Sequence, residues 1–258
     1  MGQVRAPLAA GIGRSLRLYY GDVDRAARMQ ALYARFVRPG ALAFDIGAHV
    51  GDRVACFRRL GARVVAVEPQ PACARALRLI HGRDGGVALV QSAVGASAGR
   101  AEMRVNADNP TVSTLSEAFV AAAQGAEGWY RERWDRTIEV PVTTLDSLIA
   151  RHGAPEFLKV DVEGLEDQVL AGLSHPVSAL SFEATMIHRA AALRALDRVA
   201  ALGQYRFAWS LGESFALGPW EGAETMSQRI AALPERANSG DVYAVRADAP
   251  LAASLGAG

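Results

Sequence analysis

The sequence predicts an α/β fold in which a mostly parallel β-sheet is covered by helices on both faces. Two observations lead to this prediction. Short, almost entirely apolar runs alternate along the chain with runs whose apolar residues recur at helical spacing. Near-continuous apolar strands separated by helices are typical of parallel strands buried on both sides. Half of the 258 residues are apolar, so the chain can bury a substantial core.

Composition excludes several classes of protein. The formal charge of +1 gives no signal for a nucleic-acid partner, and no apolar stretch is long enough to span a bilayer. Gly and Arg interrupt the apolar part of the first 20 residues, which makes a poor secretory signal, and Ala6 breaks the myristoylation pattern. Cys56 and Cys73 are too few for a disulfide framework. We therefore expect two reduced thiols in a cytoplasmic protein.

The first half of the chain begins with a helix and then alternates. Apolar residues at helical spacing predict a helix over 22–37, with Asp22 as its N-cap, and Pro39-Gly40 ends it. Strands are then expected at 41–47, 63–69 and 87–95, helices at 52–60 and 70–81, and a further strand or hairpin arm at 101–106.

Residues 107–136 interrupt this alternation. They combine a turn, a short helix and an aromatic group formed by Trp129, Tyr130 and Trp134. Packing against the edge of the core explains such aromatics more simply than a lid over a pocket does, and both interpretations stay open.

The alternation resumes at residue 137. We expect extended segments at 137–143, 156–164, 177–185, 205–210 and 241–247, helices at 144–152, 165–173 and 189–202, and a glycine-rich loop region at 211–240. This divides the chain into an N-terminal helical segment (1–40), a main domain (41–247) with two insertions or substrate loops (107–136 and 211–240), and a flexible tail (248–258).

Ligands of such folds bind beyond the carboxyl ends of the strands, so residues that follow strands are the candidates. Gly47 and Gly51 follow the first strand and precede a helix, where glycines let the backbone approach a ligand. The spacing does not match the G-x-G-x-x-G of a pyrophosphate site, because His49 occupies the second glycine position. Asp45 would repel a phosphate but suits a cation. S-adenosylmethionine carries both an ammonium and a sulfonium, and we expect it to bind here.

Glu68 ends the second strand, about 20 residues beyond the glycines. An acid at this distance can hydrogen-bond both hydroxyls of a ribose. NAD and S-adenosylmethionine both contain that diol, so Glu68 alone does not separate them. Ser92, after the third strand, is expected to contact the adenine.

A second group of polar residues lies in the run "FLKVDVEG". Asp161 and Glu163 are two residues apart, and in a strand they would project the same way. Like charges this close need a cation beside them. There are three candidates for this cation. One is Lys159, which is the only lysine of the chain; the second is a divalent metal such as Mg²⁺, held by Asp161 and Glu163; the third is the sulfonium of the cofactor.

Five stretches in order resemble the FkbM-type methyltransferases: "FDIGAHVGD", "VAVEPQP", "VPVTTLDSLI", "FLKVDVEGLEDQVLAGL" and "LSFEAT". The resemblance covers roughly residues 20–247. It implies a Rossmann-like class I methyltransferase fold with a mostly parallel seven-stranded sheet, S-adenosylmethionine as cofactor, and methylation of hydroxyls on sugars, polyketides and other secondary metabolites. Its cofactor-binding residues carry over onto Asp45, Gly47, Gly51 and Glu68, and His49 stands where the family usually has Asn.

A neutral alcohol is a weak nucleophile, so a general base or a metal must lower its proton affinity. Asp161 is the first candidate base and His188 the second. Lys159 could hold a carboxylate or stabilise an alkoxide, and Glu183, which ends the next strand, could orient the acceptor. The alternatives are an NAD-dependent oxidoreductase or epimerase and a non-catalytic binding domain. We expect a small-molecule acceptor and neither a nucleic-acid nor a membrane partner, and a homodimer stays open.

Overall fold

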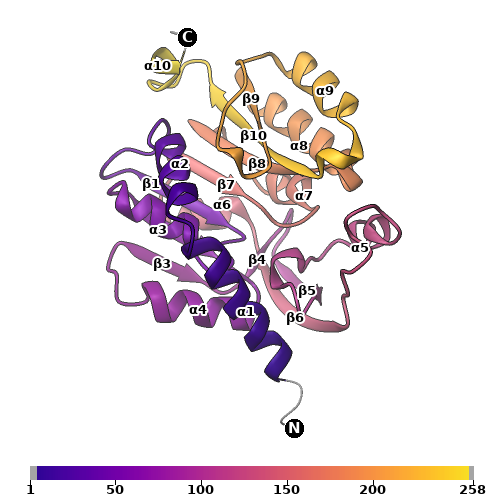
Figure 1. Cartoon of the computed structure of the whole chain (residues 1–258). Helices are drawn as coiled ribbons and strands as arrows, with labels where there is room; N and C mark the ends of the chain where they lie inside the picture. The colour runs from indigo at the N-terminus through magenta and orange to yellow at the C-terminus, as the bar shows by residue number, and fades with distance from the viewer. Residues whose placement is uncertain (1–4, 256–258) are drawn as a thin grey trace.

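A seven-stranded β-sheet forms the centre of the protein. The computed structural model describes residues 5–255, and the strand order is β3-β2-β1-β7-β8-β10-β9 (Figure 1). The first five strands in this order are parallel, whereas β10 runs antiparallel to β8 and β9. The predicted mostly parallel, seven-stranded sheet is confirmed. The strands are β1 (Leu42–Ile46), β2 (Arg63–Val67), β3 (Val87–Val90), β7 (Phe157–Val160), β8 (Ala179–Thr185), β9 (Tyr205–Leu211) and β10 (Ser239–Arg246).

Helices cover both faces of this sheet, as the alternation of the sequence predicts. Leu32, Phe57 and Leu77 belong to an apolar cluster on one face, and Leu148 and Leu196 belong to a second cluster on the other. Figure 1 shows the two groups of helices on opposite sides of the sheet. The first group is α2 (Val23–Tyr33), α3 (Asp52–Arg59) and α4 (Pro71–His81), and the second is α6 (Leu145–His152), α7 (Glu166–Ala171), α8 (Arg189–Leu202) and α9 (Ala223–Ala232).

Helix α9 corrects the expectation of a loop over 211–240. It packs on the core through Met226 and Ile230, which are one helical turn apart and fully buried. The glycines that precede it in the sequence hid this short amphipathic segment.

A small second sheet lies beside the main one. It has the order β4-β6-β5 and consists of β4 (Ala93–Val94), β5 (Gly99–Val105) and β6 (Arg136–Thr143). The strand expected at 87–95 is therefore split: its first part pairs with β2 in the main sheet, and its last part pairs with β6. The chain changes sheets at Gln91 and Ser92, which puts Ser92 at the edge where the two sheets meet.

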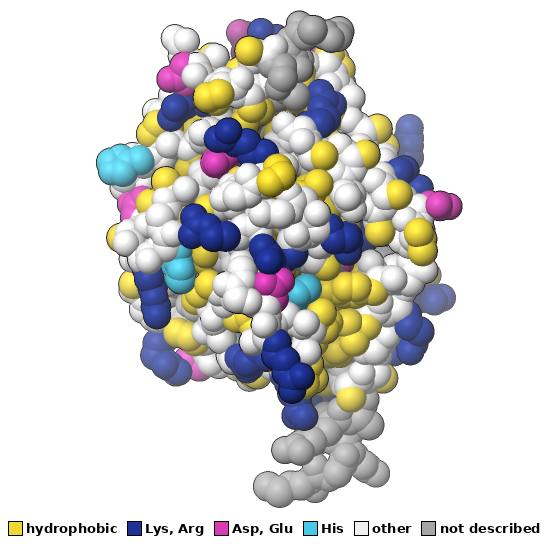
Figure 2. Space-filling model, turned by 90° about the vertical axis from the view of Figure 1, so that its left-hand side faces the viewer, with side chains coloured by type: hydrophobic (Ala, Val, Ile, Leu, Met, Phe, Trp, Pro, Cys, Tyr) yellow, Lys and Arg dark blue, Asp and Glu magenta, His cyan; other side chains and the backbone are white. Residues whose placement is uncertain are grey.

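The N-terminal segment contains two helices rather than one. Asp22 caps α2 as expected, since its Oδ1 accepts a hydrogen bond from the amide of Arg25 at 2.8 Å. The preceding helix, α1 (Arg5–Tyr20), packs through Gly11 against Ala107 and Pro110. Figure 2 shows the face on which these helices lie, with arginine side chains scattered among apolar ones rather than gathered in a single patch.

The aromatic side chains of residues 107–136 take part in packing. The ring of Phe119, in α5 (Glu117–Ala123), lies 5.2 Å from the ring of Trp129 and 6.3 Å from that of Trp134, edge to face in both cases. Tyr130 is exposed. The interpretation of the two tryptophans as edge packing is thus the one that the structure favours.

The end of the chain was expected to be a flexible tail over 248–258. Residues Ala252–Leu255 form a short helix, α10, and the last three residues of that prediction lie outside the described part of the chain. Within residues 5–255, no helix combines the length and the apolar character needed to cross a membrane.

Candidate cofactor and active site

Two glycines in the left-handed conformation shape the loop after β1. Gly47 has φ +84° and Gly51 has φ +88°. A Cβ on Gly47 would overlap the carbonyl oxygen of Asp161, and a Cβ on Gly51 would lie 2.6 Å from a methyl group of Leu77. Glycine at both positions therefore lets this loop lie directly against the end of β7 and against α4. His49, between them, also has a positive φ of +49°.

A cavity of about 830 Å³, open to solvent, lies beyond the carboxyl ends of β1, β2 and β7. The chain order reverses between β1 and β7, so the cavity occupies the topological switch point of the sheet. Of the residues predicted for the site, eight line the cavity: Asp45, Gly47, His49, Glu68, Ser92, Lys159, Asp161 and Glu163.

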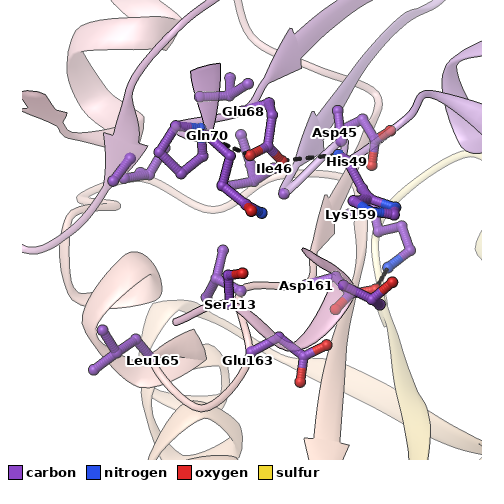
Figure 3. A pocket seen from close by; sticks show the side chains of 18 of the residues that line it. Asp45, Ile46, His49, Glu68, Gln70, Ser113, Lys159, Asp161, Glu163 and Leu165 are labelled. Carbon is purple, nitrogen blue, oxygen red and sulfur yellow. Dashed lines mark hydrogen bonds and ion pairs between the residues drawn. The ribbon is translucent and has the colours of Figure 1, made fainter. Parts of the chain in front are cut away.

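Glu68 is held with its carboxylate at the cavity wall. The amide of Gln70 donates to Oε1 at 2.7 Å, and the amide of His49 donates to Oε2 at 2.9 Å (Figure 3). The residue is only 3% exposed, and burial raises the pKa of Glu68 to about 7 although these two hydrogen bonds oppose the change. Each oxygen keeps a lone pair that can accept a hydrogen bond from a ligand hydroxyl.

Asp45 and His49 line the same wall beside Tyr19 of α1. Burial raises the pKa of Asp45 to about 7, despite the opposing charge of Lys159. Burial lowers the pKa of His49 to about 4, so its ring is neutral at physiological pH. Tyr19 packs edge-on against that ring at 5.6 Å. A cationic ligand group beside Asp45 would restore the charged carboxylate.

Ser92 lies at the cavity wall with its hydroxyl between two carbonyl groups. Its Oγ is 2.8 Å from the carbonyl oxygen of Ala93 and 2.9 Å from that of Pro141. The proton of the hydroxyl is therefore directed at the backbone, and the oxygen can only accept a hydrogen bond from a ligand.

Lys159 and Asp161 form a partly buried ion pair at the end of β7. The Nζ of Lys159 donates to Oδ2 of Asp161 at 2.6 Å, and Lys159 is 1% exposed. Burial by itself would raise the pKa of Asp161, but the charge and hydrogen bond of Lys159 hold it below its usual value. Burial would likewise lower the pKa of Lys159, yet the charges of Asp161 and Asp241 raise it well above its usual value. Both groups of the pair are charged.

Three carboxylates converge beside this pair. Oxygen atoms of Asp161, Glu163 and Glu183 lie within 4.8 Å of one another. Burial and the neighbouring acids raise the pKa values of Glu163 and Glu183 well above the usual range. The expected reason for this convergence was wrong, because β7 ends at Val160 and Glu163 does not continue the strand. A left-handed turn at Glu163, φ +58°, brings its side chain back to Asp161.

The remaining predicted residues lie outside the cavity lining. Gly51 begins α3 behind the loop. Glu183 reaches the carboxylate group from β8. His188 ends a short 3₁₀ turn (Met186–His188) before α8, and the charges that act on it come from Arg194 and Asp167 on the helical side.

Several residues at the site carried no signal in the sequence. Tyr19 and Arg53 line the cavity, and Gln70 does so beside Glu68. The guanidinium of Arg53 is bound to Asp52 at 2.8 Å and also contacts Glu213, a residue from beyond β9. A segment of the second sheet and its following turn adds Met103, Thr111, Ser113 and Leu115 to the lining.

The part of the chain that contains most of this site matches a known protein family. Residues 45–207, which include the loop after β1 and the ends of β2, β7 and β8, match the family model described as the methyltransferase FkbM domain. No curated protein matches the chain.

Solved structures that match this protein share little sequence with it. A methyltransferase FkbM from Methylobacillus flagellatus KT is 15% identical with a TM-score of 0.49; the match covers 80% of this chain but only 43% of that one. An O-methyltransferase from Bacillus cereus, solved in complex with SAH, is 11% identical over 92% of this chain and 90% of its own, with a TM-score of 0.46. A precorrin-6y C5,15-methyltransferase from Geobacter metallireducens GS-15 is 13% identical over 86% and 88%, with a TM-score of 0.41.

Proposed function

Because the chain belongs to the FkbM family of S-adenosylmethionine-dependent methyltransferases, we propose that it methylates a hydroxyl group of a small molecule such as a sugar or a polyketide. The observation that carries this proposal is a cavity with a carboxylate fixed by two backbone amides, Glu68, on one wall and an ion-paired carboxylate, Asp161, on another. Because the chain belongs to this family, the site is interpreted as that of a methyltransferase and not of an NAD-dependent oxidoreductase.

The cofactor half of the proposal uses residues from the ends of β1, β2 and β3. The two oxygens of Glu68 accept hydrogen bonds from the ribose hydroxyls, since backbone amides already orient them. Asp45 attracts the positively charged methionine end, and the glycine loop lets that end approach the backbone. Ser92 lies on the side where the adenine would lie.

The reacting half of the proposal uses Asp161 and Lys159. The hydroxyl oxygen of the acceptor forms a bond to the methyl carbon while the bond from that carbon to sulfur breaks, and the electron pair of the broken bond stays on sulfur. The hydroxyl proton passes to a carboxylate oxygen of Asp161. Lys159 fixes the other oxygen at 2.6 Å, and Glu183 orients the acceptor from the neighbouring strand. Asp161 is a better candidate than His188, because Asp161 lines the cavity and His188 does not.

The test begins with the cofactor and ends with the product. Calorimetric titration should detect binding of S-adenosylmethionine and S-adenosylhomocysteine and no binding of NAD. Purified enzyme is then incubated with methyl-labelled cofactor and a panel of sugars and polyketides, and the labelled product is located by mass spectrometry and NMR. Label on oxygen supports the proposal. Label on nitrogen or carbon contradicts it. So does a protein that binds the cofactor but transfers no methyl group, or one whose methyl transfer is not abolished by Asp161→Asn.

A further inference from the structure

The cluster of acidic side chains beside the cavity, Asp161, Glu163 and Glu183, has a further neighbour on the next strand of the sheet, β10. In the antiparallel pairing of β8 with β10, Asp241 lies directly opposite Glu183. Residues directly opposite on neighbouring strands point to the same face of the sheet, about 5 Å apart. Asp241 is 9% exposed, and its Oδ1 is buried without a hydrogen-bond partner. Four acidic side chains from three chain segments therefore share one small region.

The basic side chains nearby do not balance this group. Lys159 is the closest, and its charge acts on both Asp161 and Asp241, but its one resolved hydrogen bond goes to Asp161. The guanidinium of Arg53 is held by Asp52 and Glu213. Like charges placed opposite each other destabilise a sheet, so Glu183 opposite Asp241 costs stability unless these side chains are protonated or a cation lies between the carboxylates.

The backbone holds Glu163 in place for such a cation. Glu163 is 8% exposed and adopts a left-handed conformation, which is uncommon for a residue other than glycine. Its carbonyl oxygen accepts a hydrogen bond from Oγ1 of Thr114 at 2.7 Å, and Gly164 follows it with φ +93°. The strained turn directs the carboxylate back toward Asp161, across the pocket from Glu68 (Figure 3).

We propose that Asp161, Glu163 and Glu183 bind a hard divalent cation such as Mg²⁺, with Asp241 adding negative charge behind Glu183. The ligand atoms are all carboxylate oxygens, which magnesium, manganese and calcium prefer and which suit zinc less well. Oxygen atoms within 4.8 Å of one another need only small rotations of their side chains to reach a common ion.

The chemical use of this ion rests on the proposed function, whereas its binding does not. An acceptor hydroxyl that binds a divalent cation at the cavity wall loses its proton more readily. With the ion bound, the oxygens of Asp161 are taken by the ion and Lys159, and an oxygen of Glu163 or Glu183 that does not bind the ion receives that proton in place of Asp161. A second hydroxyl on the acceptor would let it chelate the ion, which favours a vicinal diol as the acceptor class.

Binding is tested with Mn²⁺ on protein saturated with S-adenosylhomocysteine. Free Mn²⁺ gives an electron paramagnetic resonance signal that disappears on binding. We expect one Mn²⁺ per chain, displaced by Mg²⁺, and at least tenfold weaker binding in Glu163→Gln and in Glu183→Gln. Asp241→Asn should weaken binding by a smaller factor. The matched control is Glu102→Gln, an exposed acid on the small second sheet, which should leave Mn²⁺ affinity unchanged.

Two outcomes would overturn the site. One is Mn²⁺ that stays free at millimolar concentration; the other is equal binding by Glu102→Gln, Glu163→Gln and Glu183→Gln. Affinity for S-adenosylhomocysteine, measured on each variant, shows that the variant is folded, and Glu183→Gln serves if Glu163→Gln fails to fold. Methyl transfer that continues undiminished in EDTA, by a protein that binds no Mn²⁺, would refute the cation site and leave the proposed function intact.

Discussion

In the loop after β1, the identity of a residue is constrained by its backbone conformation and its neighbours, and Gly47 is the clearest case. Its positive φ and its closeness to the carbonyl group of Asp161 are separate constraints. The first concerns the conformation of one residue, and the second joins the loop after β1 to the end of β7. A substitution that violates both constraints should therefore lower the free energy of unfolding more than one that violates only the first.

Gly47→Ala is expected to lower the free energy of unfolding by roughly 2–4 kcal/mol, from a strained φ and from overpacking against Asp161. Gly40→Ala is the matched control, because Gly40 has nearly the same φ, +81°, and open space around it. It should cost only about 1–2 kcal/mol. Urea unfolding measures both. Equal losses in the two variants would mean that the contact with Asp161 is unimportant.

Glu68 allows a prediction about binding and pH. Glu68→Gln should weaken binding of S-adenosylhomocysteine by about 10–100-fold, the range expected when a charged hydrogen-bond acceptor is lost. Since the pKa of Glu68 is raised to about 7, a proton must leave before the carboxylate can accept both ribose hydroxyls. Affinity of the unaltered protein should therefore rise as pH increases through about 7.

Calorimetry across this pH range checks the prediction, with the slope compared between the two proteins. Glu68→Gln should show the shallower slope, and any slope that remains is assigned to Asp45, whose pKa is also raised to about 7. A steep slope that is identical in both proteins would show that Glu68 does not titrate on binding.

At the scale of elements, α1 contributes to the cavity wall from outside the region that the family model matches. It carries Tyr19 to the cavity wall, and Oη of Tyr20 donates to the carbonyl oxygen of Val50 at 3.1 Å. The helix reaches this position by close packing at Gly11, where a Cβ would lie 2.6 Å from the carbonyl oxygen of Ala107. The position of α1 should therefore depend on the absence of a side chain at residue 11.

Gly11→Val is expected to displace α1 and to weaken binding of S-adenosylhomocysteine, with a loss of about 1–3 kcal/mol in unfolding free energy from overpacking. Gly13→Val, on the same helix, is the control, since the nearest atom to its Cβ would be 3.8 Å away. Hydrogen exchange of α1 and calorimetric affinity distinguish the two. If both variants bind equally well, α1 has no part in the cavity.

At the scale of the whole molecule, buried acids should make stability depend on pH. Burial raises the pKa values of Asp45, Glu68 and Glu166 to about 7 in the folded protein, compared with about 4 in the unfolded chain. Between those values the folded state binds more protons, so the stabilisation is complete below about pH 4 and is lost as pH rises through about 7. Acids with lowered pKa values, such as Asp52 and Asp84, act oppositely and only at lower pH.

We therefore expect the protein without cofactor to have a larger unfolding free energy near pH 5.5 than near pH 8. Urea unfolding at the two values gives the sign directly. Glu68→Gln should reduce the difference, because one of the titrating groups is gone. A free energy of unfolding that increases from pH 5.5 to pH 8 would contradict the prediction, and would mean either that these carboxyls are ionised in the folded state or that the lowered pKa of His49 outweighs them.

Prediction from sequence succeeded where structure is local. Three predictions depend on a few consecutive residues: Asp22 as an N-cap, a strand that contains Asp45 and ends just before Gly47, and Glu68 after the next strand. Prediction failed for α9 and for the split of residues 87–95 between two sheets, because packing partners decided those elements. The convergence of Glu163 on Asp161 was expected for a wrong reason, since a strained turn and not a strand produces it.

The sequence by itself determined the α/β class and the cofactor side of the site, because apolar periodicity and the strand–glycine–helix order are short-range properties of the chain. Tertiary structure alone brought in the residues that the sequence did not signal. Tyr19, Arg53 with Glu213, and Asp241 opposite Glu183 come to the site from segments separated by up to about 220 residues. No periodicity in the sequence records such meetings, since they are set by strand register and by how helices pack across the sheet.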